Sequence, residues 1–222
     1  MEKGTAVAPP AERAYKRQTM MPTPPPAAGR AIRFAALGLG LAAALLVLLI
    51  AAGAFDPRPL GPWAAGSQPG PLSLSGRGQT TLPQAAPFAT PPARYSVHLS
   101  AAYVDGELDS GYGLTVGEGE TLTVAVSPLG EAAVWTTATA GATPRALVPW
   151  QPWPHVRPGA ASNEIWLDVD SDRQVTVWIN RERLWQGELG AGGPLGGAAL
   201  WLASFGGPVT VDFQALDWYG SP

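Results

Sequence analysis

The sequence contains no cysteine and only two histidines, His98 and His155, among its 222 residues. Without cysteine the chain cannot form a disulfide or carry a lipoprotein anchor, so an extracytoplasmic domain must be held together by its core alone. Neither histidine stands at a recognisable spacing from a nucleophile or from other metal ligands. The sequence therefore gives no support for a catalytic triad or a zinc site.

Charge is also scarce, since only 14% of the residues are charged, and residues 34–55 carry no charge at all. At about 1.5 Å per residue, a helix over this run reaches across a hydrocarbon core of about 30 Å. We therefore predict a transmembrane helix over residues 34–55 whose partner is the lipid bilayer. The rival interpretation is a signal peptide cleaved near Ala54, but the apolar run is long for one and 33 residues precede it.

The charges on the two sides of this run differ in sign. Residues 1–33 hold six basic and two acidic residues, a formal charge of +4, whereas residues 56–222 hold eight arginines and fifteen acidic residues, a formal charge of −7. Basic residues close to a membrane span stay in the cytoplasm. We therefore expect a single-pass protein of the cell membrane with a cytoplasmic N-terminus, an extracytoplasmic C-terminal part and no nucleic-acid partner.

Proline and glycine divide the rest of the chain. Residues 1–33 are rich in proline and poor in apolar periodicity, which predicts a disordered cytoplasmic tail. Residues 56–92 carry nine prolines and five glycines, which predicts an extended linker. From residue 93 to residue 222, apolar and polar residues alternate with period two between regularly spaced turn residues. This pattern is typical of an all-β fold, so we predict an antiparallel β-sandwich of the jelly-roll type over 93–222.

One predicted hairpin stands out, formed by "EIWLDVD" and "QVTVWIN" around an acidic turn. The apolar odd-numbered positions are expected to face the core, which leaves Trp166 directly across from Trp178 on the other face, with Cβ atoms about 5 Å apart. Two such indoles can stack on a sugar ring while Glu164 and Asn180 bond its hydroxyl groups. The alternative is a cross-strand pair, covered by a loop or a second layer, that only stabilises the sheet.

The acidic residues of this hairpin suggest two further kinds of site. Laminarinase-type glycoside hydrolases place three carboxylates on one strand face as Glu-x-Asp-x-x-Glu, but here Trp166 occupies the middle position after Glu164. We therefore assign no catalytic residue and expect no enzyme. Asp168, Asp170 and Asp172 begin as a calcium loop does, although its glycine and final glutamate are absent. These three residues are candidates for binding calcium, which is the one cofactor we consider. The alternative is that they are solvated acids of the turn.

Two more tryptophans, Trp150 and Trp153, occur in "LVPWQPWPHVRPG". The four prolines of this segment exclude a central strand, so both residues are expected on a loop or an edge strand. Because the segment precedes the hairpin, it could form the lip of a ligand groove. Equally, it could fold over the sheet and bury both rings.

Taken together, "SGYGLTV", "LTVAVSPLGEAAVW", the hairpin and "VTVDFQALDW" resemble the concanavalin A-like lectin/glucanase superfamily. They are particularly similar to bacterial extracytoplasmic domains grouped with laminin G-like modules and the 3-keto-disaccharide hydrolase domain. The resemblance implies a jelly roll with one strand led by Asn163 and a later strand ending in Asn180. Two features depart from it. Asn180-Arg181 replaces the usual Asn-Gly pair, which predicts a turn longer than type I′, and the leading strand has no clear counterpart.

Three functions follow from these observations. The first is a membrane-tethered module that binds carbohydrate or another surface component through Trp166, Trp178 and the loop with Trp150 and Trp153. The second is a structural or accessory subunit that docks a membrane protein partner. The third is a glycoside hydrolase, which the interrupted carboxylate pattern disfavours. Exposed indoles in a groove would favour the first function, and a flat apolar patch above about 400 Å² the second.

Overall fold

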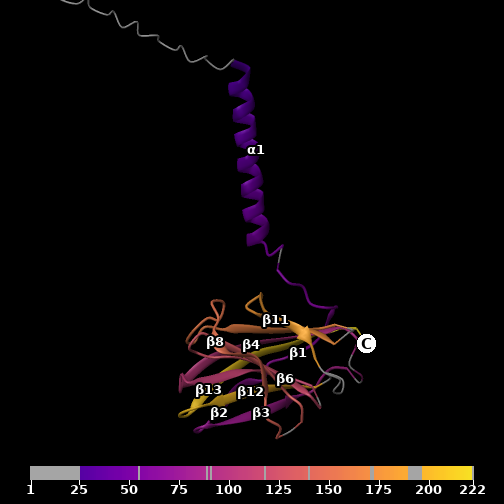
Figure 1. The fold of residues 1–222 in the computed structure, drawn as a ribbon, viewed down its shortest axis with the longest axis vertical. Coiled ribbons are helices and arrows are strands. Elements are labelled where there is room, and N and C mark those ends of the chain that lie inside the picture. Colours follow the sequence, from indigo (N-terminus) through magenta and orange to yellow (C-terminus); the bar gives the residue numbers. More distant parts are fainter. Residues whose placement is uncertain are drawn as a thin grey trace, which may run out of the picture. The chain divides into compact units, whose positions relative to one another are not determined.

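The computed structural model describes residues 26–54, 56–88, 90, 92–117, 119–139, 141–170, 173–189 and 197–221 (Figure 1). These residues belong to two compact units, one ending at residue 55 and one beginning at residue 56. Most of the tail that the sequence predicts to be disordered, residues 1–25, lies outside the described residues. Within the described part of the chain there are one helix and thirteen strands.

The helix of the first unit, α1, runs from Pro26 to Ala51. Proline suits the first position of a helix, where its missing N–H has no intrahelical partner. The helix ends in a Schellman motif in which Gly53, with φ at +68°, donates its N–H to the carbonyl of Ile50 and Ala54 donates to Leu49. Residues 32–51 have a mean hydropathy of 2.7. By length and composition this helix can cross a membrane, although it begins and ends earlier than predicted.

The second unit is a sandwich of two antiparallel sheets, as predicted (Figure 1). The seven-stranded sheet has the order β1-β13-β4-β9-β10-β11, with β2 pairing one half of the long strand β13. The six-stranded sheet has the order β3-β12-β5-β6-β7-β8. The strands of the first sheet are β1 (Trp63–Ser67), β2 (Gly70–Leu74), β4 (Tyr95–Gly106), β9 (Asn163–Val169), β10 (Gln174–Ile179), β11 (Glu182–Glu188) and β13 (Val209–Gly220). Those of the second are β3 (Gly78–Gln84), β5 (Ser110–Val116), β6 (Thr121–Val126), β7 (Glu131–Thr137), β8 (Arg145–Pro152) and β12 (Ala198–Ser204).

The core lies between the two sheets and is built by the period-two alternation. The odd-numbered apolar residues of β9 and β10 are at most 5% exposed, which confirms their predicted inward orientation: Ile165, Leu167, Val169, Val175, Val177 and Ile179. The largest fully buried side chains of the core are Tyr112 and Phe213. The even-numbered residues of β9 and β10 consequently face away from the core.

The linker predicted for residues 56–92 is instead part of the sandwich from Trp63 onward. Strands β1 and β2 pair with β13, and β3 pairs with β12. The prolines of β2 and β3 are tolerated because both are edge strands, where a missing N–H breaks no ladder. Leu72 and Leu74 pack against the core. The chain itself therefore supplies the leading strands that the sequence pattern did not reveal.

The turn between β10 and β11 is also shorter than predicted. Ile179 pairs with Glu182, so only Asn180 and Arg181 connect the strands, and their φ angles are +51° and +73°. Positive φ at both positions is the geometry of a type I′ turn, which asparagine enters readily and arginine seldom does. Arg181 is held there by an ion pair with Asp56 and by Glu164, whose Oε2 lies 3.7 Å from its Nε.

Candidate functional site

The predicted pair Trp166 and Trp178 lies on the outer face of the seven-stranded sheet. The two residues are directly opposite in register, and their ring centroids are 6.5 Å apart with planes inclined at 48°. Trp166, however, is only 4% exposed, because its ring packs against His98 with centroids 3.7 Å apart. This residue therefore cannot serve as the open stacking platform that the sequence suggested.

Asp168 binds both indoles of this pair. Its Oδ1 accepts the N–H of Trp166 at 2.6 Å, and its Oδ2 accepts the N–H of Trp178 at 2.9 Å. Oδ1 also accepts the hydroxyl of Ser96 at 2.5 Å, and Ser96 Oγ in turn accepts the backbone N–H of Leu60 at 2.7 Å. Burial raises the pKa of Asp168, while the three hydrogen bonds act to lower it. The segment before β1 is thus tied to this face, and the cluster is structural.

The acidic residues of the calcium candidate do not act together as one site. Asp168 is engaged as described, and Asp170 forms an ion pair with Arg94 at 3.0 Å. Asp172 lies outside the described residues. Among the residues that the structure describes, no group of three or more acidic, histidine or cysteine side chains is arranged to hold a metal ion.

Asn180 and Glu164 also contact other parts of the protein. The amide of Asn180 accepts the N–H of Glu164 at 2.8 Å and donates to the carbonyl of His155 at 2.6 Å and to Oδ1 of Asn163 at 2.8 Å. Asn163 is buried and bonds the hydroxyl of Tyr112 at 3.0 Å. The two asparagines that the superfamily resemblance singled out therefore fasten the segment after β8 to the hairpin.

His98 is neutral in the folded protein. Its Nδ1 lies 3.9 Å from Oε1 of Glu164, too far for a hydrogen bond, and burial lowers the pKa of His98 from 6.5 to about 3. Desolvation of the charged imidazolium therefore outweighs the attraction of Glu164, and an ion pair does not form. The phenol ring of Tyr219, with its centroid 4.6 Å away, closes the other side of the imidazole.

This burial predicts a pH-dependent stability. Below pH 6.5 the unfolded chain protonates His98 whereas the native protein does not, so the free energy of unfolding decreases as the pH falls from 6.5 towards about 3. The contribution of His98 is at most about 1.4 kcal/mol per pH unit. Guanidinium titrations followed by tryptophan fluorescence should show this slope between pH 6 and pH 4.5. It should shrink in His98→Phe and persist in His155→Gln, and an unchanged slope in His98→Phe would contradict the assignment.

The other predicted pair, Trp150 and Trp153, separates at the end of β8, an edge strand as anticipated. Trp153 packs against the core. Trp150 lies on the outer face of the six-stranded sheet, where its ring centroid is 6.4 Å from that of Trp135. Trp135 in turn contacts Trp201 edge-on, with centroids 5.0 Å apart and planes inclined at 72°. We call Trp135, Trp150 and Trp201 the tryptophan face.

Small residues beneath the rings explain how the tryptophan face forms. Ala125 and Ala203 are buried under the indoles. A Cβ atom on Gly111 would lie 2.9 Å from Cη2 of Trp150 and 3.1 Å from Cζ3 of Trp201. Because these positions carry one carbon or none, the indoles can lie against the backbone of the central strands.

The tryptophan face lines a hollow of about 280 Å³ with polar groups that are free to bind. Among the described residues, none of the three indole N–H groups has a hydrogen-bond partner in the protein. Trp201 is only 7% exposed, yet its N–H is not among the sealed, unsatisfied atoms and so stays open to solvent. This contrasts with Trp166 and Trp178, whose N–H groups both bond Asp168.

A second hollow of about 250 Å³ adjoins the first, since Trp150 and Phe205 line both. Asp109 and Glu131 bring carboxylates to it, and Ser110, Ser127 and Leu129 complete its lining. We call it the acidic hollow. An aromatic surface next to hydrogen-bonding groups in a concave site is the usual composition of a small-molecule binding site.

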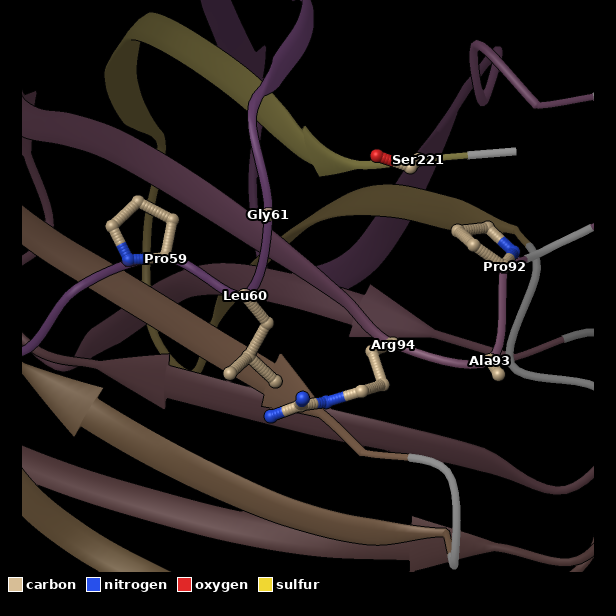
Figure 2. A pocket seen from close by; sticks show the side chains of 7 residues that line it. All are labelled: Pro59, Leu60, Gly61, Pro92, Ala93, Arg94 and Ser221. Atoms are coloured by element: carbon tan, nitrogen blue, oxygen red, sulfur yellow. The ribbon is translucent and has the colours of Figure 1, made fainter.

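A larger hollow, of about 670 Å³, lies elsewhere (Figure 2). Its lining consists of Pro59, Leu60, Gly61, Pro92, Ala93, Arg94 and Ser221. The one charged side chain in this lining, Arg94, is paired with Asp170 at 3.0 Å, and Figure 2 shows it alongside Leu60. With no aromatic surface and little uncommitted polar chemistry, this hollow is a weaker site than the tryptophan face.

Trp135 and Trp201 were missed by the sequence analysis, although the alternation carries a signal for them. In "EAAVWTT" the core residue is Val134, and in "AALWLAS" the core residues are Leu200 and Leu202. Each tryptophan therefore alternates with the core residues of its strand and lies on the outward face. An outward tryptophan on a strand that alternates cleanly is a candidate for binding.

Comparison with known proteins supports the fold. No family model and no curated protein matches the sequence. A chain solved in connection with the endo-acting O-glycanases that human gut microbiota express to initiate mucin breakdown is 8% identical, with a TM-score of 0.50 over 68% of this chain and 80% of that one. The CBM40 of the Ruminococcus gnavus IT-sialidase is 15% identical, with a TM-score of 0.44 over 70% and 91%. Sheep galectin-11 in complex with glycerol is 12% identical, with a TM-score of 0.41 over 65% and 98%. At 8% identity, the similarity to the first of these chains shows the β-sandwich fold alone.

Proposed function

We propose that this protein is a membrane-anchored, non-catalytic β-sandwich module that binds carbohydrate through the tryptophan face. One observation carries the proposal: three indoles with unbonded N–H groups line a hollow on the outer face of the six-stranded sheet. A pyranose ring can pack its C–H face on an indole, and its hydroxyl groups can bond indole N–H donors and nearby carboxylates. Membership of the concanavalin A-like superfamily is part of this proposal.

Anchoring by α1 and the orientation of the chain are the second part of the proposal. The helix has the length and hydropathy for a span, and the formal charge changes from +4 before residue 34 to −7 after residue 55. The chain should therefore stay with membranes after carbonate washing, and protease added to intact cells should remove the sandwich. Release of a soluble product whose N-terminus lies just after a cleavage site near Ala54 would instead identify a cleaved signal peptide.

A panel of immobilised neutral and charged oligosaccharides tests the binding function. The full chain should be presented in nanodiscs, because glycoside detergents would compete for a sugar site. We expect saturable binding to a subset of the glycans, accompanied by a change in tryptophan fluorescence. Absence of binding to every oligosaccharide, with the protein folded, would contradict the proposal.

A further inference from the structure

The acidic hollow gives one end of the tryptophan face a negative charge. Asp109 and Glu131 line it, and no arginine or lysine is among the described residues that line either hollow. Glu107 stands beside them, with Oε1 accepting the N–H of Asp109 at 3.1 Å and Oε2 accepting that of Gly207 at 3.2 Å. A hollow lined by charge of one sign concentrates the field of that sign.

The position of these carboxylates matters because the two hollows adjoin each other. Trp150 and Phe205 line both, so the neighbour of a sugar stacked on the tryptophan face would lie within reach of Asp109 and Glu131. The nearly buried indole of Trp201 lines the first hollow, and its N–H, which has no partner among the described residues, can donate to a ligand. Together the two hollows reach the volume of about 300–1,000 Å³ that small-molecule sites occupy.

We propose that the acidic hollow selects glycans by charge, favouring a sugar residue with a protonated amino group over a neutral one and rejecting one with a carboxylate. This inference rests on the proposed carbohydrate-binding function. An ammonium group gains attraction from both carboxylates, whereas an added carboxylate meets repulsion and finds no cation among the lining residues. An interaction of a partly exposed charge pair corresponds to about a two- to fivefold change in affinity.

Three trimers with one β-1,4-linked glucosamine backbone test this selectivity. They carry a free amine, an N-acetyl group or an N-succinyl group at the same nitrogen, and they are titrated at pH 6.0 into the full chain in zwitterionic nanodiscs. We expect the amine to bind about two- to fivefold more tightly than the acetyl form per carboxylate engaged, and the succinyl form to bind most weakly. The differences should decrease as salt is added.

Variants assign the effect to the acidic hollow. Glu131→Gln and Asp109→Asn should each lower the preference for the amine over the N-acetyl trimer about two- to fivefold. Glu188→Gln, an exposed acid on β11 in the other sheet, is the matched control. Equal affinities, tighter binding of the succinyl form, or no binding of any trimer would overturn the charge selectivity. If the neutral oligosaccharides of the panel still bind and their binding depends on Trp150, the carbohydrate-binding function stands although the charge selectivity is refuted.

Discussion

Replacing Trp150 by alanine should weaken glycan binding by about 10- to 100-fold, the effect typical of a central aromatic residue in a binding site. Trp150 lies in the lining of both hollows, so its loss removes stacking surface from each. Affinities of wild type and variant for the same oligosaccharide, measured by isothermal titration calorimetry in nanodiscs, give the comparison.

Two further variants separate binding from folding in this test. Phe205→Ala removes a ring that is 42% exposed and lines both hollows, so it should weaken binding with little loss of stability. Trp63→Ala removes an indole that is 62% exposed on an edge strand of the other sheet, and it should leave the affinity unchanged. Wild-type affinity in both Trp150→Ala and Phe205→Ala would exclude the tryptophan face as the site.

Asp168→Ala should lower the free energy of unfolding by about 3 kcal/mol. The substitution leaves the N–H groups of Trp166 and Trp178 and the hydroxyl of Ser96 without their acceptor, and each buried donor left unsatisfied costs about 1–3 kcal/mol. Asp168→Asn should cost less, because an amide keeps one acceptor oxygen. Chemical denaturation of the full chain measures both effects.

Asp212 on β13 provides the control, because its carboxylate makes no hydrogen bond within the described chain. Asp212→Ala should change the free energy of unfolding by less than about 0.5 kcal/mol. If Asp168→Ala lowers the free energy of unfolding by no more than this, the hydrogen bonds of Asp168 with Trp166, Trp178 and Ser96 do not stabilise the sheet. A rise in wild-type stability on adding calcium, lost in Asp168→Ala, would restore the calcium interpretation.

The hairpin shows how far the sequence alone could reach. Period-two alternation predicted the inward residues of β9 and β10 and the opposition of Trp166 and Trp178, because both depend only on neighbouring strands. Whether Trp166 is exposed depends on His98, which lies 68 positions earlier in the sequence. A local pattern cannot contain that contact.

The tryptophan face and the edge strands were hidden for a related reason. Trp135, Trp150 and Trp201 meet because β12 pairs with β5 and the order continues through β6 and β7 to β8, an arrangement of the whole sheet. Residues 63–84 looked like a linker because proline content dominates their composition. Edge strands accept proline, so composition alone could not distinguish a linker from a strand that completes a sheet.

The most direct test of the central claim is a fluorine NMR titration of the full chain labelled with 5-fluorotryptophan, in nanodiscs, with an oligosaccharide that binds. Each of the nine tryptophans gives a separate probe, assigned by single tryptophan-to-phenylalanine substitutions. We predict that the signals of Trp135, Trp150 and Trp201 shift on binding while those of Trp166 and Trp178 stay in place. Shifts confined to Trp166 and Trp178 would place the ligand on the opposite sheet and contradict the proposed site.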